Sequence, residues 1–252
     1  MRPEDILNNA IESIKSGIDK VDNTYESHIR EKAIKEVNKK IEEKGLNIEQ
    51  IQNDDYEAMI SDLSKDIKAD YAKKAAQGLL YDANYDRNLI EERLFCKGIL
   101  YEYNRLHPSL LEEREKLLKK LLGKTGKNLL IEQPFLCDYG YNIEIGENFY
   151  TNHNVVILDC AKVTFGDNVF VAPNCGFYTA GHPLDAETRN KGLENAKPIT
   201  IGNNVWLGAG CSVLPGVTIG DNAVIGAGSV VTKDIPAHVL AFGNPCKVVK
   251  EI

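Results

Sequence analysis

The 252-residue chain lacks several features that would point to particular classes of protein. It has no apolar run long enough to cross a membrane, and its first residues, MRPEDILNNA, contain no apolar core of the kind found in signal peptides. It has no excess of basic residues, because the formal net charge is −7, and this argues against nucleic acid as the main partner. Its six cysteines form no C-x-x-C pair, so we expect no zinc cluster and a reducing, cytoplasmic setting.

Glycine is almost absent from residues 1–75, where Ile, Leu and Val recur every three or four positions among many charged residues. This spacing predicts amphipathic helices, and we expect a helical N-terminal extension of unknown role. The high charge leaves a disordered segment as the alternative. Residues 76–126 continue the helical pattern with more aromatic side chains, so we expect a second helical segment there.

From residue 127 the sequence becomes a tandem repeat with a period of six. Glycine often follows the first position of each hexad, and the fifth position is small or β-branched. The period fits neither an α-helix nor an alternating strand, but it fits a chain that turns a corner every six residues and stacks into a triangular column. The aliphatic first positions would fill that column; they are Ile201, Leu207, Val213, Ile219, Ile225 and Val231.

The repeat continues upstream with one change of phase. Phe165, Val171 and Phe177 lie in phase with Ile201, whereas the run that starts at Ile145 is two residues out of phase. We therefore expect two extra residues to be absorbed near 162–164. The fold class predicted from this pattern is mainly β, a parallel β-helix of hexapeptide repeats preceded by an α-helical N-terminal region.

The repeat is interrupted by a polar loop at residues 180–198, AGHPLDAETRNKGLENAKP. A loop that leaves a rigid solenoid is a common place for a functional site. The loop contains His182, and histidine has a pKa suited to general-base catalysis near neutral pH.

Several segments resemble the maltose/galactoside O-acetyltransferase family of hexapeptide-repeat acyltransferases. They are LYDANYDRNLIEERLFCKGILYEYN, CDYGYNIEIGENFYTNHNVVILD, TAGHPLDAETRNKGLENAKPITIGNNVWLGAG, LPGVTIGDNAVIGAGSVVTKDIP and GNPCKVV. The resemblance covers about residues 76–252, and the helical signature together with GHPLDAETRN is its most specific part. It implies a left-handed β-helix, an acetyltransferase domain over 127–252, and an acceptor-side helical segment over 76–126.

The resemblance also implies the roles of individual residues. His182 falls on the catalytic histidine, which would deprotonate a sugar hydroxyl for direct attack on the acetyl-CoA thioester, with no metal required. Asn152 matches an asparagine near the developing oxyanion, although a hexad corner also favours asparagine. The acceptor contacts would include Asp138, Cys160 and Glu194, together with Asn84 or Asp86. Where galactoside enzymes carry Asp-Asp, this chain has Asp159-Cys160. The loss of a carboxylate favours a maltose- or glucose-type acceptor.

Coenzyme A needs an apolar surface for its pantetheine arm and cations for its phosphates. The resemblance implies that these contacts come from Trp206, Ala209, Ala227, Thr232, Lys233, Lys247 and Lys250. The two C-terminal lysines also fit an ordinary solvated tail. The family is trimeric, so we expect a homotrimer whose active sites lie between subunits.

Three alternatives remain beside this interpretation. The acceptor could be a galactoside, a cell-surface glycan or a xenobiotic. A solenoid of the γ-carbonic anhydrase type would bind zinc on three histidines, but His153, His182 and His238 form no H-x4-H pair. The chain could also be a non-enzymatic interaction protein that binds a partner through its N-terminal helices.

Overall fold

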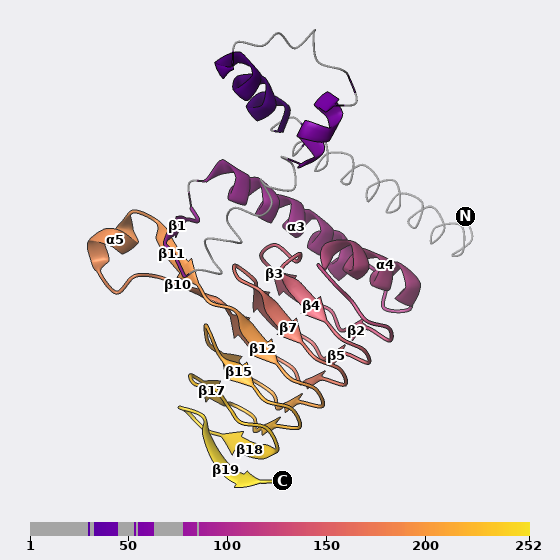
Figure 1. Ribbon diagram of the computed structural model, residues 1–252. Coiled ribbons are helices and arrows are strands. Elements are labelled where there is room, and N and C mark those ends of the chain that lie inside the picture. The colour runs from indigo at the N-terminus through magenta and orange to yellow at the C-terminus, as the bar shows by residue number, and fades with distance from the viewer. Residues whose placement is uncertain (1–29, 31–32, 45–52, 54, 63–77, 85) are drawn as a thin grey trace, which may run out of the picture. The chain divides into compact units, whose positions relative to one another are not determined.

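The chain divides into two compact units, Met1–Lys73 and Lys74–Ile252. The computed structural model describes residues 30, 33–44, 53, 55–62, 78–84 and 86–252 (Figure 1). In the first unit, the described stretches 33–43 and 55–62 are helical, and Val37, Ile41 and Ile60 pack into a small apolar cluster. The rest of the predicted N-terminal extension lies outside the described residues.

The second unit begins with a short strand and two helices: β1 (Tyr81–Asp82), α3 (Arg87–Arg105) and α4 (Leu111–Leu121). Pro108 separates the helices, because the residue before a proline disfavours helical backbone. In α4, the side chains of Leu117, Leu118 and Leu121 recur at helical spacing and are buried. Among the residues that the structure describes, no helix is long and apolar enough to cross a membrane.

The hexads fold into a parallel β-helix whose short strands form three sheets, as Figure 1 shows. Sheet I consists of β4 (Ile143–Ile145), β7 (Val163–Phe165), β12 (Ile199–Ile201) and β15 (Thr218–Ile219). Sheet II consists of β2 (Leu130–Ile131), β5 (Tyr150–Thr151), β8 (Phe170–Val171), β13 (Trp206–Leu207), β16 (Val224–Ile225), β18 (Val239–Phe242) and the antiparallel β19 (Lys247–Glu251). Sheet III consists of β3 (Phe135–Cys137), β6 (Val155–Leu158), β9 (Gly176–Tyr178), β14 (Ser212–Val213) and β17 (Val230–Val231). The predicted fold class is confirmed.

The first positions of the hexads point inward and form one continuous apolar column. Ile201, Leu207, Val213, Ile219, Ile225 and Val231 are all buried. Toward α3 and α4, aromatic side chains fill the column. The ring centroids of Phe165 and Phe177 lie 4.9 Å apart in an edge-to-face arrangement. Because each coil covers the open end of the next, the column is buried only when the coils stack.

The edge between sheets I and II shows why asparagine recurs in the repeat. Five asparagines there have positive φ, a conformation that asparagine tolerates better than most residues. Each of the first four donates from its side-chain amide to the amide oxygen of the next asparagine, at 2.8–3.1 Å. This ladder consists of Asn128, Asn148, Asn168, Asn204 and Asn222.

The two other edges bear on function. We name the edge between sheets II and III the small-residue edge; it comprises 152–154, 172–174, 208–210 and 226–228. We name the edge between sheets III and I the loop edge; it comprises 138–142, 159–162, 179–198, 214–216 and 232–234.

The change of phase falls on the loop edge. Ile145 pairs with Phe165, twenty residues further on, whereas Ile201 pairs with Ile219, eighteen residues further on. The extra residues were expected near 162–164, but Val163 and Phe165 are regular members of β7. The structure places them instead in the corner 159–162, which lies beside the similarly wide corner 138–142.

Candidate active site

The loop at residues 180–198 is an ordered excursion from the coil. It consists of β10 (Ala180–Gly181), the short helix α5 (Ala186–Asn190) and β11 (Leu193–Ala196). The strand β11 pairs antiparallel with both β10 and β1, so the loop is joined to the segment before α3 (Figure 1). Asp185 caps α5 by accepting the backbone N–H of Thr188 at 2.7 Å. These contacts fix the start of the loop, where His182 lies.

The imidazole of His182 is exposed, and one hydrogen bond determines its tautomer. Its Nδ1 atom lies 3.3 Å from the carbonyl oxygen of Leu193. A carbonyl oxygen only accepts, so Nδ1 carries the proton in this contact. In the neutral ring, the lone pair is then on Nε2, which is the arrangement that a general base requires.

Polar side chains gather on the loop edge around the base of this loop. The hydroxyl of Tyr81 donates to Oε1 of Glu194, and the thiol of Cys160 donates to Oδ2 of Asp138 at 3.4 Å. Burial raises the pKa of the Tyr81 hydroxyl and of the Cys160 thiol well above their ordinary values, so both stay protonated and act as donors. We name these four residues the loop-edge cluster. Tyr81 was not among the predicted site residues, because only the β1–β11 pairing brings it there.

Asn84 and Asp86 follow β1 and differ in their surroundings. Oδ1 of Asp86 accepts the backbone N–H of Leu89 at 3.4 Å, at the start of α3. Asn84 lies in the turn before the helix and is exposed. Arg93 fixes this turn by donating to the carbonyl oxygen of Ala83 at 2.6 Å. Of the two candidates, Asn84 is therefore the one whose side chain is presented to solvent.

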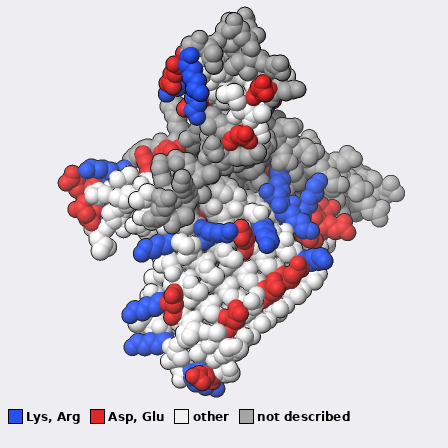
Figure 2. All heavy atoms as spheres, viewed as in Figure 1, with Lys and Arg blue, Asp and Glu red and all other residues white. Residues whose placement is uncertain are grey.

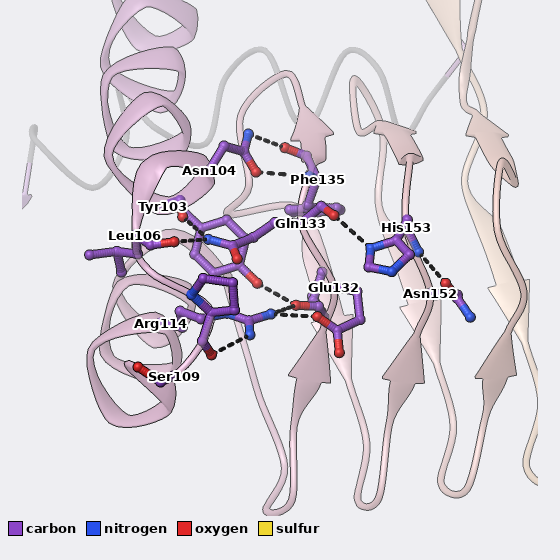
Figure 3. A network of polar contacts seen from close by, with 12 residues as sticks. Tyr103, Asn104, Leu106, Ser109, Arg114, Glu132, Gln133, Phe135, Asn152 and His153 are labelled. Carbon is purple, nitrogen blue, oxygen red and sulfur yellow. Dashed lines mark hydrogen bonds and ion pairs between the residues drawn. The ribbon is translucent and has the colours of Figure 1, made fainter.

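Asn152 lies on the small-residue edge, and its side-chain amide has a defined orientation (Figure 3). Its Oδ1 accepts the backbone N–H of His153 at 2.8 Å, so the NH2 group is the side that faces outward. The imidazole of His153 lies 2.7 Å from the carbonyl oxygen of Gln133. Gln133 in turn donates to the carbonyl oxygens of Tyr103 and Leu106, at the end of α3. The helix end thus supports the corner that presents Asn152.

The predicted coenzyme A contacts fall on several surfaces of the coil. Ala209 and Ala227 are exposed on the small-residue edge, and the adjoining Trp206 is 55% exposed on sheet II. Stacking is tight at this edge, because a Cβ atom on Gly208 would lie 2.6 Å from the backbone nitrogen of Ala227. Lys247 and Lys250 are exposed on β19.

Thr232 and Lys233 lie instead on the loop edge, where Lys162 and Lys197 are also exposed. Figure 2 shows basic side chains along the edge from which the loop leaves and acidic side chains along the opposite edge. Lys162 forms an ion pair with Glu144 at 2.6 Å. The loop edge, from which the loop with His182 leaves, therefore carries exposed lysine side chains.

One chain thus carries its predicted site residues on two different edges. His182 and the loop-edge cluster lie on one side of sheet III, and Asn152, Ala209 and Ala227 lie on the other side. The three histidines of the solenoid are also apart, with His153 and His238 on different edges and His182 in the loop. Within the described part of the chain, no group of three His, Cys, Asp or Glu side chains is placed to hold a metal ion.

Comparisons with known proteins agree with this architecture. Residues 74–126 match the maltose acetyltransferase hexapeptide capping motif, and residues 198–233 match six repeats of the bacterial transferase hexapeptide. The chain is 59% identical over 175 residues to the putative acetyltransferase YJL218W of Saccharomyces cerevisiae, covering 69% of this chain and 89% of that protein. It is 52% identical over 164 residues to galactoside O-acetyltransferase of Escherichia coli, covering 65% and 81%.

Two solved structures give the same result. A maltose O-acetyltransferase from Clostridium difficile is 50% identical with a TM-score of 0.70, covering 72% of this chain and 97% of that chain. A galactoside acetyltransferase in complex with coenzyme A is 48% identical with a TM-score of 0.70, covering 72% and 90%. The fold and the loop therefore define a hexapeptide-repeat acetyltransferase. The chain belongs to the maltose and galactoside O-acetyltransferase family, and the predicted enzyme class and acetyl-CoA cofactor are confirmed at that level.

Proposed function

We propose that this chain transfers the acetyl group of acetyl-CoA to a hydroxyl group of maltose or a related glucose-type sugar, with His182 as the general base. The hydrogen bond from Nδ1 of His182 to Leu193 supports this role, because it leaves the lone pair of Nε2 to accept a proton. The sugar oxygen attacks the thioester carbonyl carbon as its proton moves to Nε2. The carbon–sulfur bond then breaks, and the departing thiolate takes the proton from the imidazolium.

The tetrahedral intermediate carries a negative oxygen that needs a hydrogen-bond donor already in place. We assign this role to the NH2 group of Asn152. The bond from the backbone N–H of His153 to Oδ1 supports the assignment, because it prevents the amide from presenting its oxygen (Figure 3). The donor is set by the backbone, so it needs no rearrangement during the reaction.

The division of the site between two edges supports a homotrimer with shared active sites. In a closed ring of three prisms, the loop edge of one copy meets the small-residue edge of the next. His182 and the loop-edge cluster of one copy would then face Asn152, Ala209 and Ala227 of its neighbour. Coenzyme A would lie between the copies, with its arm along Trp206 and its phosphates near Thr232 and Lys233; Lys247 and Lys250 would be further phosphate contacts.

The acceptor would bind in the loop-edge cluster. Asp138 and Glu194 offer carboxylate oxygens to sugar hydroxyls, and Asn84 offers an amide. Position 160 carries a cysteine thiol where the galactoside enzymes are expected to carry a carboxylate. The thiol donates its hydrogen to Asp138. A poorer set of acceptor oxygens there supports a maltose- or glucose-type sugar over a galactoside.

Complementation between two inactive variants tests both the base and the shared site. His182→Ala should lose about 10²–10⁴-fold in turnover while still binding acetyl-CoA, and Asn152→Ala should also be impaired. When the two variants are mixed in equal amounts and allowed to exchange subunits, about a quarter of the sites should pair an intact His182 with an intact Asn152. Activity of the mixture should rise accordingly. No recovery would place both residues in one chain's site, and unchanged turnover in His182→Ala would remove it from the mechanism.

A further inference from the structure

Asp159 is a fully buried carboxylate for which the proposed reaction has no use. It follows β6 directly and lies in the wide corner 159–162. Its Oδ1 accepts the backbone N–H groups of Asp138 and Tyr139, at 3.0 and 2.9 Å. Its Oδ2 is buried and has no hydrogen-bond partner among the described residues. A buried charge with an unused oxygen costs free energy, so this residue needs an explanation other than packing.

The two bonds accepted by Asp159 fix the turn that carries Asp138. The backbone N–H of Asp138 is held by Asp159, and Oδ2 of Asp138 accepts a hydrogen bond from Sγ of Cys160 at 3.4 Å. The corner is closed from the other side, because the amide of Asn142 donates to the carbonyl oxygen of Asp159 at 2.7 Å. The position of the Asp138 side chain in the loop-edge cluster thus depends on Asp159.

The same turn is connected to the segment that carries Asn84. The hydroxyl of Tyr139 accepts a hydrogen bond from Arg93 at 2.6 Å. The other arm of that guanidinium donates to the carbonyl oxygen of Ala83, the residue before Asn84, at 2.6 Å. One buried carboxylate is therefore linked directly to Asp138 and, through Tyr139 and Arg93, indirectly to the turn that carries Asn84.

We propose that Asp159 is the positioning residue of the acceptor site, and that it acts by accepting the two N–H groups of the Asp138–Tyr139 turn. The inference rests on the proposed function, since it takes Asp138 and Asn84 as contacts of the sugar. Asp159 does not touch the sugar. A misplaced turn would weaken sugar binding while leaving the coenzyme A surfaces of the small-residue edge intact, because those lie across sheet III.

Two substitutions separate this role from a merely structural one. Asp159→Asn keeps an oxygen that accepts both N–H groups, whereas Asp159→Val has a similar shape and accepts neither. In the full-length protein, Asp159→Val should raise the KM for the sugar about tenfold or more, with the KM for acetyl-CoA changed less than about twofold. Asp159→Asn should restore the KM for the sugar to within about threefold of wild type.

A control variant is offered by Thr179, which contacts the corner 159–162 from the next coil. The buried hydroxyl of Thr179 accepts the N–H of Ala161 at 2.9 Å and donates to the carbonyl oxygen of Leu158 at 2.6 Å, without touching the Asp138 turn. Thr179→Val should therefore lower stability without changing the ratio of the two KM values. An equal change of that ratio in Thr179→Val and Asp159→Val would indicate general damage to the corner and overturn the proposal.

Three further outcomes decide the matter. An active Asp159→Val with an unchanged KM for the sugar contradicts the proposal, and so does an Asn variant as impaired as the Val variant. If Asp159→Val does not fold, Tyr139→Phe removes the hydroxyl that accepts the hydrogen bond from Arg93 and should raise the KM for the sugar severalfold. No rise would contradict the linkage. Failure of the proposed function would be seen separately, as undiminished turnover in His182→Ala.

Discussion

The buried carboxylate of Asp159 makes the stability of this protein depend on pH in a direction that can be worked out. Burial, together with the charge of Asp138, raises the pKa of Asp159 from 3.8 to about 7, although the N–H groups of the 138–139 turn oppose this. Between these two values the folded chain holds a proton that the unfolded chain has released. The contribution of Asp159 to the free energy of unfolding therefore falls as pH rises through this window. Cys137 and Cys160 are the other titratable groups that face this carboxylate.

Asp159→Asn removes this titration while keeping an acceptor for the two N–H groups. A difference of about three pKa units corresponds to about 4 kcal/mol per chain at 1.36 kcal/mol per unit. The free energy of unfolding of the variant should match that of wild type near pH 4. The difference should then grow by about 1.4 kcal/mol per pH unit and reach about 4 kcal/mol in favour of the variant above pH 7. The experiment is equilibrium urea unfolding of both proteins at about pH 4.5, about pH 6 and about pH 8, at one protein concentration because assembly contributes to stability.

A second aspartate supplies a control of opposite sign. Asp185 caps α5, and its hydrogen bonds with Thr188 lower the pKa of its carboxyl. The stabilisation from the ionised Asp185 carboxylate is present above the pKa that this group has in the unfolded chain, and it is lost as pH falls below that value. Relative to wild type, Asp185→Asn should therefore become less stable as pH rises. A stability difference for Asp159→Asn that stays constant, or that shrinks with rising pH, would refute the reasoning.

Two further predictions concern the ligands. Lys233→Ala should raise the KM for acetyl-CoA more than the KM for the sugar, because an exposed lysine on the loop edge suits a phosphate group; steady-state kinetics with each substrate varied in turn would show it, and equal changes would count against phosphate binding. Cys160→Asp should raise kcat/KM for a galactoside relative to maltose by about tenfold, since it adds a carboxylate to the loop-edge cluster; an unchanged ratio would remove Cys160 from the acceptor contacts.

The six-residue period predicted the column, its inward positions and the loop, because burial imposes the period directly on the sequence. Ile201, Val213 and Ile225 are buried as expected. The six-residue period does not predict contacts between segments that are far apart in the sequence. Tyr81 meets Glu194 only through the pairing of β1 with β11, and no local pattern records a contact between segments so far apart in the chain.

The phase of the repeat also determines which edge of the prism carries each site residue, although this is harder to see in the sequence than the inward positions of the column. A corner follows each strand, and the phase of the repeat assigns every corner to one of three edges. The phase alone therefore puts His182 and Asn152 on different edges. The resemblance to the family implied a site shared between subunits, and the phase of the repeat shows which edge of one chain carries each of these two residues.

The change of phase was the most informative local signal, and its meaning is physical. A regular corner in this coil has room for small residues or for an asparagine with positive φ, as in the ladder. The wide corners 138–142 and 159–162 have extra backbone, so they can turn N–H groups inward to a buried side chain such as Asp159. Asp138 and the buried Cys160 in these corners then form a hydrogen bond with each other at the base of the loop. In a solenoid whose regular coils leave little freedom, a break in the period therefore marks where a polar site can be built.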